Sequence, residues 1–327
     1  MKIYLPNSAF LGNIDAFLKV IDISNPDVLE ITSNNKWISV HPVVLCMVAS
    51  LGVEVRSRNL NSPIKCERFT ATSKHYFERM GLFSFLNLNS EIEIIKHESA
   101  GRFIPLTQIK DYANLSKFIE EKKHLHNLDQ KHVQPIKYII SELVRNVLEH
   151  SDSKNGAIVS AQYYNKSNTI RIGIVDSGVG ISKTIRKSHI APTDLDAIQL
   201  ALTPGITGTT NKEGGTDYNA GAGLFFTKSI AKINRDFFIL YSGNTLYKLL
   251  REKKGTKAKE IVLYSDPLAD KHSKETELPY WSGTVVGIDI GLEKTEEFNI
   301  LLDIIRNIYT TSVRDRKQAK YKKQKFI

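Results

Sequence analysis

The stretch Ser141-Glu142-Leu143-Val144-Arg145-Asn146 is the first of three short sequence patterns that indicate the fold. We expect a helix over residues 135–150, because apolar side chains recur there at helical spacing. Glu142 and Asn146 then share one helix face, one turn apart. A carboxylate beside an amide oxygen suits Mg²⁺ and its water, with Asn146 as ligand and Glu142 as general base. Taken alone, the pair is equally typical of a solvated helix face.

A second pattern follows an expected strand. Residues 169–175 alternate and are rich in β-branched side chains, which is typical of a strand. Asp176 ends it, and Gly178 and Gly180 follow. A carboxylate there can accept a hydrogen bond from an exocyclic amine and so prefer adenine to guanine, while glycines let the backbone approach a planar ring. An ordinary turn at the end of a strand is the alternative.

A third pattern opens a helix expected over residues 221–233. Gly221 and Gly223 precede Leu224, and a helix N-terminus offers N–H groups to phosphates. Ahead of it, residues 203–220 show no periodic pattern and are rich in Gly and Thr, which is typical of a lid or binding loop. A plain helix start after a disordered loop is the alternative. Together and in this order, the three patterns indicate an ATP site without a P-loop.

These motifs resemble those of the GHKL ATPases, which include gyrase, MutL-type repair proteins, histidine kinases and anti-sigma-factor kinases. Ile140–Asn146 resembles the N box, Asp176–Gly180 the G1 box and Gly221–Leu224 the G2 box. Gly283 and Thr284 resemble the family's closing Gly-Thr, whose hydroxyl supports the adenine-binding Asp through water. The resemblance spans residues 131–292. It implies an α/β sandwich with a mixed, mainly antiparallel sheet and helices on one face.

The resemblance also implies a function. Histidine kinases usually carry Asn where this chain has Glu142, whereas the ATPases and anti-sigma kinases carry Glu. We therefore expect an ATP- and Mg²⁺-dependent ATPase acting as a regulatory switch in a bacterial-type signalling or defence system. A serine/threonine kinase of the anti-sigma type and a non-hydrolysing ATP sensor are the alternatives. Lys212 and Lys228 are the cations available for phosphate, or else solvated surface lysines.

Four regions are expected. Residues 1–110 form a small α/β domain that weakly resembles STAS domains, with helix 42–51 and strands 52–56 and 91–96 among its elements. Residues 111–130 form a linking helix, 131–295 the ATP-binding domain, and 296–327 an amphipathic helix and a basic tail.

Composition limits the partners. The 327 residues carry a net charge of +10, and Arg314–Lys325 holds +6 of it, from seven Lys and Arg against one Asp. This tail is compatible with weak nucleic-acid contact or with a solvated helix end. An apolar stripe in helix 298–309 needs a surface on this chain, on a protein partner or on a second copy. No apolar run suits a membrane, and Cys46 and Cys66 lack CxxC partners, so we expect a cytoplasmic protein.

Overall fold

The core of the fold is a seven-stranded sheet. The computed structural model describes residues 1–59, 62–90, 103–121, 130–212, 214, 221–252, 262–292 and 298–322. The strand order is β11-β10-β9-β12-β8-β7-β6. The strands are β6 (Phe103–Ile109), β7 (Ala157–Tyr164), β8 (Thr169–Val175), β9 (Phe238–Gly243), β10 (Thr245–Leu249), β11 (His272–Glu275) and β12 (Trp281–Gly291).

All neighbouring strands in this sheet pair antiparallel, which corrects the expectation of a mixed sheet. Tight turns explain part of the pattern. Asn168 adopts φ 43° between β7 and β8, and Gly243 adopts φ 62° between β9 and β10. Each turn sends the chain straight back beside the strand it has just left.

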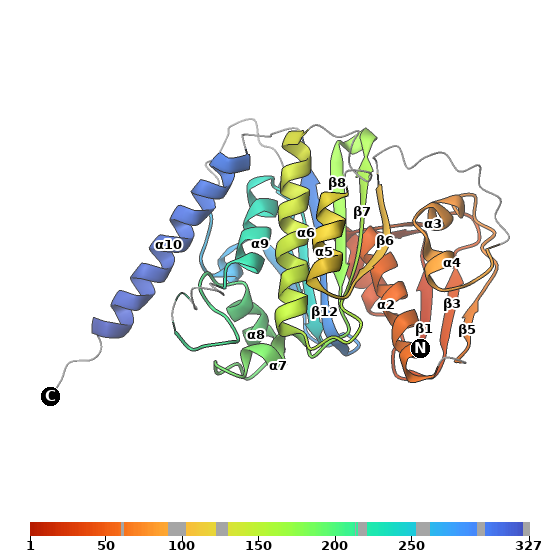
Figure 1. Cartoon of the computed structure of the whole chain (residues 1–327), viewed down its shortest axis with the longest axis horizontal. Coiled ribbons are helices and arrows are strands. Elements are labelled where there is room, and N and C mark those ends of the chain that lie inside the picture. Colours follow the sequence, from red (N-terminus) through yellow and green to blue (C-terminus); the bar gives the residue numbers. More distant parts are fainter. Residues whose placement is uncertain are drawn as a thin grey trace.

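Helices cover one face of the sheet (Figure 1). They are α5 (Tyr112–Glu120), α6 (Gln130–His150), α9 (Gly223–Ile233) and α10 (Phe298–Lys322). The helices expected over 135–150 and 221–233 are confirmed. The apolar stripe of α6 is buried in a core shared with α9 and the sheet. Leu301, Leu302 and Ile305 of α10 enter the same core, so these residues of the stripe pack on this chain, which is one of the three surfaces expected for it.

The opposite face of the sheet is also covered, which corrects the expectation of helices on one face only. Helix α2 (Pro42–Arg58) packs there on β7, β8 and β12. Most of its side chains are buried, including those that face away from the sheet. It contacts β8 at Gly173, where an added Cβ would lie 2.3 Å from Val43 Cα. The backbones can approach this closely only because residue 173 has no side chain.

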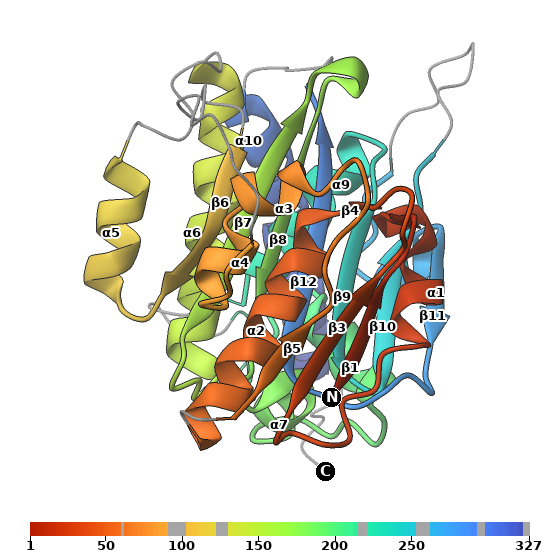
Figure 2. The same cartoon turned by 90° about the vertical axis from the view of Figure 1, so that its right-hand side faces the viewer.

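The N-terminal region adds a further layer beyond α2. Strands β1 (Lys2–Leu5), β3 (Leu29–Ser33) and β5 (Ile64–Cys66) form a parallel sheet, seen in front of α2 in Figure 2. Around them lie β2 (Ser8–Ala9), α1 (Ile14–Leu18), β4 (Ser39–Val40), α3 (His75–Arg79) and α4 (Leu82–Phe85). One apolar core runs from this sheet through α2 to buried side chains of β8, β9 and β12.

Two expectations for this region are wrong. Residues 52–56 belong to α2, because Val53 and Val55 extend a helix that is packed between two sheets. Residues 103–109 form β6, which pairs with β7 at the edge of the large sheet, so the boundary at residue 110 cuts through that sheet. The strand expected over 91–96 lies outside the described residues.

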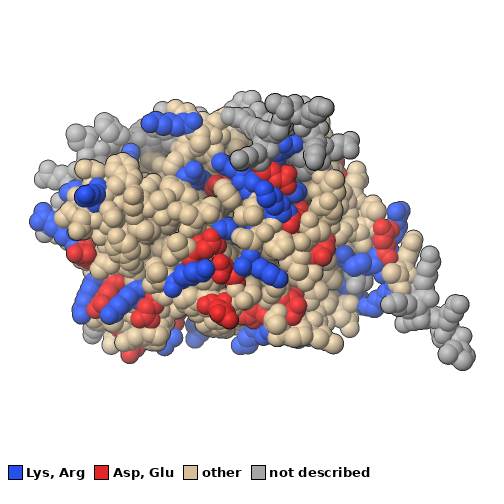
Figure 3. Space-filling view, turned by 180° about the vertical axis from the view of Figure 1, so that it is seen from behind, with Lys and Arg blue, Asp and Glu red and all other residues tan. Residues whose placement is uncertain are grey.

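Two short helices, α7 (Gly180–Ile185) and α8 (Asp194–Ala201), lie at one end of the large sheet. Of the segment expected as a lid, residues 213 and 215–220 lie outside the described residues. Among the helices the structure describes, none is long and apolar enough to cross a membrane. On the face shown in Figure 3, basic and acidic side chains are intermixed, so the excess positive charge forms no continuous basic patch on that face.

Candidate functional site

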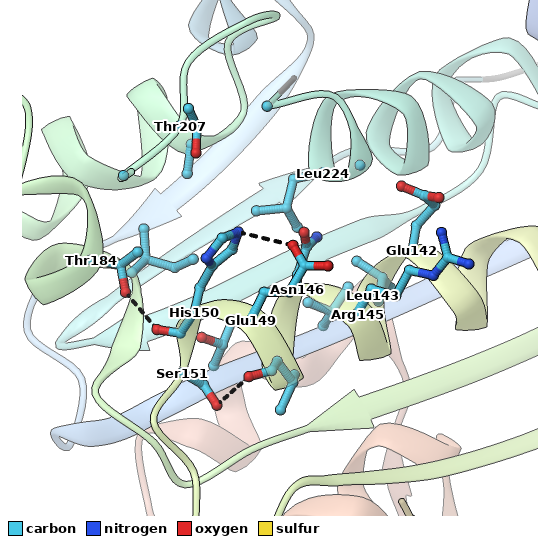
Figure 4. A pocket seen from close by; sticks show the side chains of 18 of the residues that line it. Glu142, Leu143, Arg145, Asn146, Glu149, His150, Ser151, Thr184, Thr207 and Leu224 are labelled. Carbon is cyan, nitrogen blue, oxygen red and sulfur yellow. Dashed lines mark hydrogen bonds and ion pairs between the residues drawn. The ribbon is translucent and has the colours of Figure 1, made fainter. Parts of the chain in front are cut away.

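A pocket of about 310 Å³ lies between α6, α7, the end of β8 and the start of α9. Its size is within the range of small-molecule and cofactor sites. The walls include eight of the site residues expected from the sequence. These are Glu142, Asn146, Asp176, Gly180, Gly221, Gly223, Leu224 and Thr284. Three separated sequence motifs are therefore brought together around one cavity (Figure 4).

Asp176 lies almost fully buried at the end of β8. Its Oδ1 accepts a hydrogen bond of 2.7 Å from the Gly178 amide, and its backbone oxygen accepts one of 3.0 Å from Trp281 Nε1. Burial raises the pKa of Asp176 to about 7, although hydrogen bonds from Gly178 and Thr284 oppose the rise. The carboxylate is therefore a buried acceptor that a donor in the pocket would stabilise.

Gly178 was expected at the site but does not line the pocket; it lies behind the lining, against the end of α6. A Cβ at this position would lie 2.0 Å from the backbone oxygen of Ser151, at the end of α6. The neighbouring Val179 amide donates to the same oxygen at 2.7 Å. Gly178 therefore lets the turn after β8 press against the end of α6, and so fixes Asp176 relative to Asn146.

Glu142 and Asn146 meet the first turn of α9. A Cβ at Gly223 would lie 3.0 Å from Asn146 Nδ2 and 3.2 Å from Glu142 Oε2, so a larger residue would crowd both side chains. Among the described residues, the N-cap residue of α9, Ala222, makes no side-chain capping hydrogen bond. Burial raises the pKa of Glu142, the positive charge of Arg145 opposes the rise, and the negative charge of Glu149 adds to it. A partly desolvated carboxylate of this kind is a stronger base than an exposed one.

His150 is a pocket residue to which the sequence assigned no role. It follows Asn146 by one turn, so both side chains project from α6 into the cavity (Figure 4). Its Nε2 lies 3.7 Å from Glu149 Oε2, and Glu149 Oε1 accepts a hydrogen bond of 3.0 Å from the Tyr112 hydroxyl. Burial lowers the pKa of His150, although Glu149 opposes the shift. The i, i+4 spacing from Asn146 was the available signal.

The opposite wall is formed by the chain after α8. Ile206, Thr207 and Gly208 line the cavity across from α6. They belong to the segment 203–220, whose Gly- and Thr-rich, aperiodic sequence predicted a lid or binding loop. His189 holds this segment through Nε2, which lies 2.9 Å from the backbone oxygen of Thr207. The composition pointed to the segment as a whole, whereas the tertiary fold determines which of its residues face the pocket.

Lys228 cannot serve as a phosphate ligand, which corrects that expectation. Its side chain is fully buried, and its Nζ lies 2.5 Å from Asp270 Oδ2. The residue lies on a buried part of α9, outside the pocket lining, where the Asp270 carboxylate compensates its charge. Lys212 does not line the pocket either.

A hard cation would find few protein ligands in the pocket. Among the described residues, no group of three His, Cys, Asp or Glu side chains is arranged to hold a metal. Both side chains nevertheless lie beside Gly223, where an added Cβ would be 3.6 Å from Asn146 Oδ1 and 3.2 Å from Glu142 Oε2. An amide oxygen such as that of Asn146 is a ligand type that Mg²⁺ accepts, and Mg²⁺ commonly keeps waters and completes its shell with substrate phosphates.

Comparison with known proteins adds no relative. No protein-family model matches the chain, and no curated protein matches it at a significant level.

Proposed function

We propose that the chain is a Mg²⁺-dependent ATPase of the GHKL type, acting as a nucleotide-dependent regulatory switch. The observation that carries the proposal is the pocket that gathers Glu142, Asn146 and Asp176 from an α6 helix face and a strand end. The start of α9 at Gly223 closes the same pocket, next to both α6 residues. In this proposal, base recognition, metal binding and phosphate binding occupy separate parts of one cavity.

Asp176 is the base-recognition residue in this proposal. Its buried carboxylate accepts a hydrogen bond from the exocyclic amine of adenine, which offsets the cost of burying the charge. The amide of Gly178 and the side chain of Thr284 hold the carboxylate in place. Guanine would present a carbonyl oxygen at that position, and two acceptors would face each other. The pocket should therefore prefer ATP to GTP.

The phosphates extend toward the start of α9 in this proposal. The uncapped first turn at Gly223 offers N–H groups and the positive end of the helix dipole. Asn146 would hold Mg²⁺ through its amide oxygen, and the bound ion would neutralise phosphate charge as the terminal P–O bond breaks. Tight contact between Gly223 and Asn146 keeps the metal ligand beside the phosphate site.

Glu142 is the general base. It accepts the proton of the attacking water while the oxygen of that water forms a bond to the γ-phosphorus. The bond from phosphorus to the bridging oxygen breaks, and ADP and phosphate leave. The raised pKa of Glu142 makes its carboxylate a better proton acceptor.

Mg²⁺-dependent phosphate release from ATP tests the proposal. Glu142→Gln keeps the size of the side chain but removes the base, so turnover should fall by roughly 10²-fold or more while nucleotide affinity is retained. Glu54→Gln, at a partly buried position of α2 that does not line the pocket, is the control and should leave turnover unchanged. Wild-type turnover in Glu142→Gln would contradict Glu142 as the general base. Nucleotide binding by the wild type without any phosphate release would contradict the ATPase and leave the non-hydrolysing sensor.

A further inference from the structure

One wall of the pocket is also the surface on which the C-terminal helix rests. We call residues Pro204–Gly208 the pocket wall. Ile206, Thr207 and Gly208 face the cavity. On its other side, the wall meets α10, because the guanidinium of Arg316 donates to the backbone oxygen of Pro204. A segment of five residues therefore separates the cavity from a helix that begins about 90 residues later in the chain.

Gly205 is the point at which these contacts converge. A Cβ at Gly205 would lie 2.5 Å from Val313 Cγ2, so the valine packs directly on its backbone. The Gly205 amide donates to the backbone oxygen of Gly221 at 3.2 Å, and its carbonyl accepts from the Gly214 amide at 3.0 Å. Gly221 lines the pocket just before α9. A displacement of Val313 would therefore reach both the wall and the entry to α9.

Gly221 and the pocket wall are in close backbone contact. Gly221 has φ 64°, and a Cβ there would lie 2.2 Å from the backbone oxygen of Ile206. Two backbone segments are thus in direct contact beside the cavity. Since backbone atoms cannot rotate away as a side chain can, movement of one segment is transmitted to the other.

Helix α10 is firmly held on the body of the protein. Its first turns are buried against α6 and α9, and the ring of Tyr309 lies 6.0 Å from that of Phe226 on α9. Further along, the Ser312 hydroxyl lies 2.6 Å from that of Ser265, and Val313 is almost fully buried. The helix is the outermost one in Figure 1, and it packs against both α9 and the pocket wall.

We propose that Val313 and Arg316 are positioning residues of the nucleotide pocket. They hold the pocket wall against Gly221, so that Thr207 and Gly208 face the nucleotide in a defined place. Because such coupling is reciprocal, bound nucleotide also fixes the wall against α10, and this helix is the element that reports occupancy of the pocket. The inference rests on the proposed nucleotide site.

Calorimetric titration with a non-hydrolysable ATP analogue and Mg²⁺ tests the positioning role. Arg316→Ala and Val313→Ala should each weaken affinity by roughly fivefold or more. Arg316→Lys keeps one donor for Pro204 and should recover part of the loss. Arg314→Ala is the control, because its side chain is exposed on the same helix and should leave affinity unchanged.

Amide hydrogen exchange separates positioning from general destabilisation. In Arg316→Ala, exchange should rise at residues 205–208 and stay at the wild-type level in α6. Nucleotide should lower exchange at the wall and in α10 of the wild type. Wild-type affinity in both alanine variants, or increased exchange spread over α6 and α9, would overturn the positioning role. If the wild type binds no nucleotide, the proposed function fails first; if it binds and Arg316→Ala binds equally, only this inference fails.

Discussion

Replacing Asp176 by Asn should stabilise the empty protein at neutral pH while weakening nucleotide binding. Burial raises the pKa of this carboxyl from 3.8 to about 7. Each pKa unit corresponds to about 1.4 kcal/mol, so keeping the carboxylate ionised in the fold costs up to about 4 kcal/mol at pH 8. Asn retains an acceptor for the Gly178 amide and carries no charge, so the variant avoids most of that cost.

The sign of the effect follows from the raised pKa. The folded state binds the proton more tightly than the unfolded state, so the contribution of Asp176 to stability is fully present below about pH 3.8. It is lost as the pH rises through the window up to about pH 7. The stability gained by Asp176→Asn should therefore be small at pH 4 and largest at pH 8.

Chemical denaturation of the two proteins at pH 4, 6 and 8 measures this difference in the free energy of unfolding. The control is Asp196→Asn. Hydrogen bonds from Thr193 lower the pKa of Asp196, so the wild type gains stability from this carboxylate as the pH rises, and Asp196→Asn should become less stable relative to wild type in that direction. A difference between Asp176→Asn and wild type that does not change with pH, or a variant less stable than wild type at pH 8, would refute the reasoning.

The same carboxyl links nucleotide binding to protons. The adenine amine forms a stronger hydrogen bond with the ionised carboxylate than with the protonated carboxyl, so ATP should bind more weakly as the pH falls below about 7. Binding at pH 7 should release a fraction of a proton. The enthalpy measured by calorimetry should then vary with the ionisation enthalpy of the buffer, and an enthalpy independent of buffer would exclude titration of Asp176.

Three further predictions concern other parts of the molecule. Gly178→Ala should destabilise the fold by roughly 1–3 kcal/mol in denaturant titrations, because its Cβ would lie 2.0 Å from the backbone oxygen of Ser151; an unchanged midpoint would contradict this contact. His41 caps α2, and burial lowers its pKa. The wild type should therefore lose stability relative to His41→Asn as the pH falls below 6.5, and parallel pH profiles of the two proteins would contradict this prediction. The exposed basic end of α10 should bind a DNA oligonucleotide only at low salt, so reversing the charges of Arg314 and Lys320 to Glu should abolish that binding; failure of wild type to bind at low ionic strength would mark these side chains as merely solvated.

Local patterns in the sequence identified the helices and strands that carry the site. Helix α6 was predictable because its apolar side chains repeat at helical spacing over several turns. Strand β8 was predictable from its β-branched alternation, and Asp176 from its place at the strand end. In each case local propensity and tertiary packing favour the same structure.

Features that depend on distant contacts were not predictable in this way. Val53 and Val55 suggested a strand, but α2 continues through them because both of its sides are buried. Lys228 was expected to meet phosphate, but Asp270, which lies 42 positions away, pairs with it inside the protein. The contact between Arg316 and Pro204 joins residues 112 positions apart, and no local pattern signals it.

Titration calorimetry of the wild-type protein with non-hydrolysable analogues of ATP and GTP, each with and without Mg²⁺, tests the central claim most directly. The account predicts one site per chain for the ATP analogue, tighter binding with Mg²⁺, and at least roughly tenfold weaker binding of the GTP analogue, because Asp176 would face a carbonyl oxygen. Equal affinity for the two analogues, or no binding of either, would contradict it.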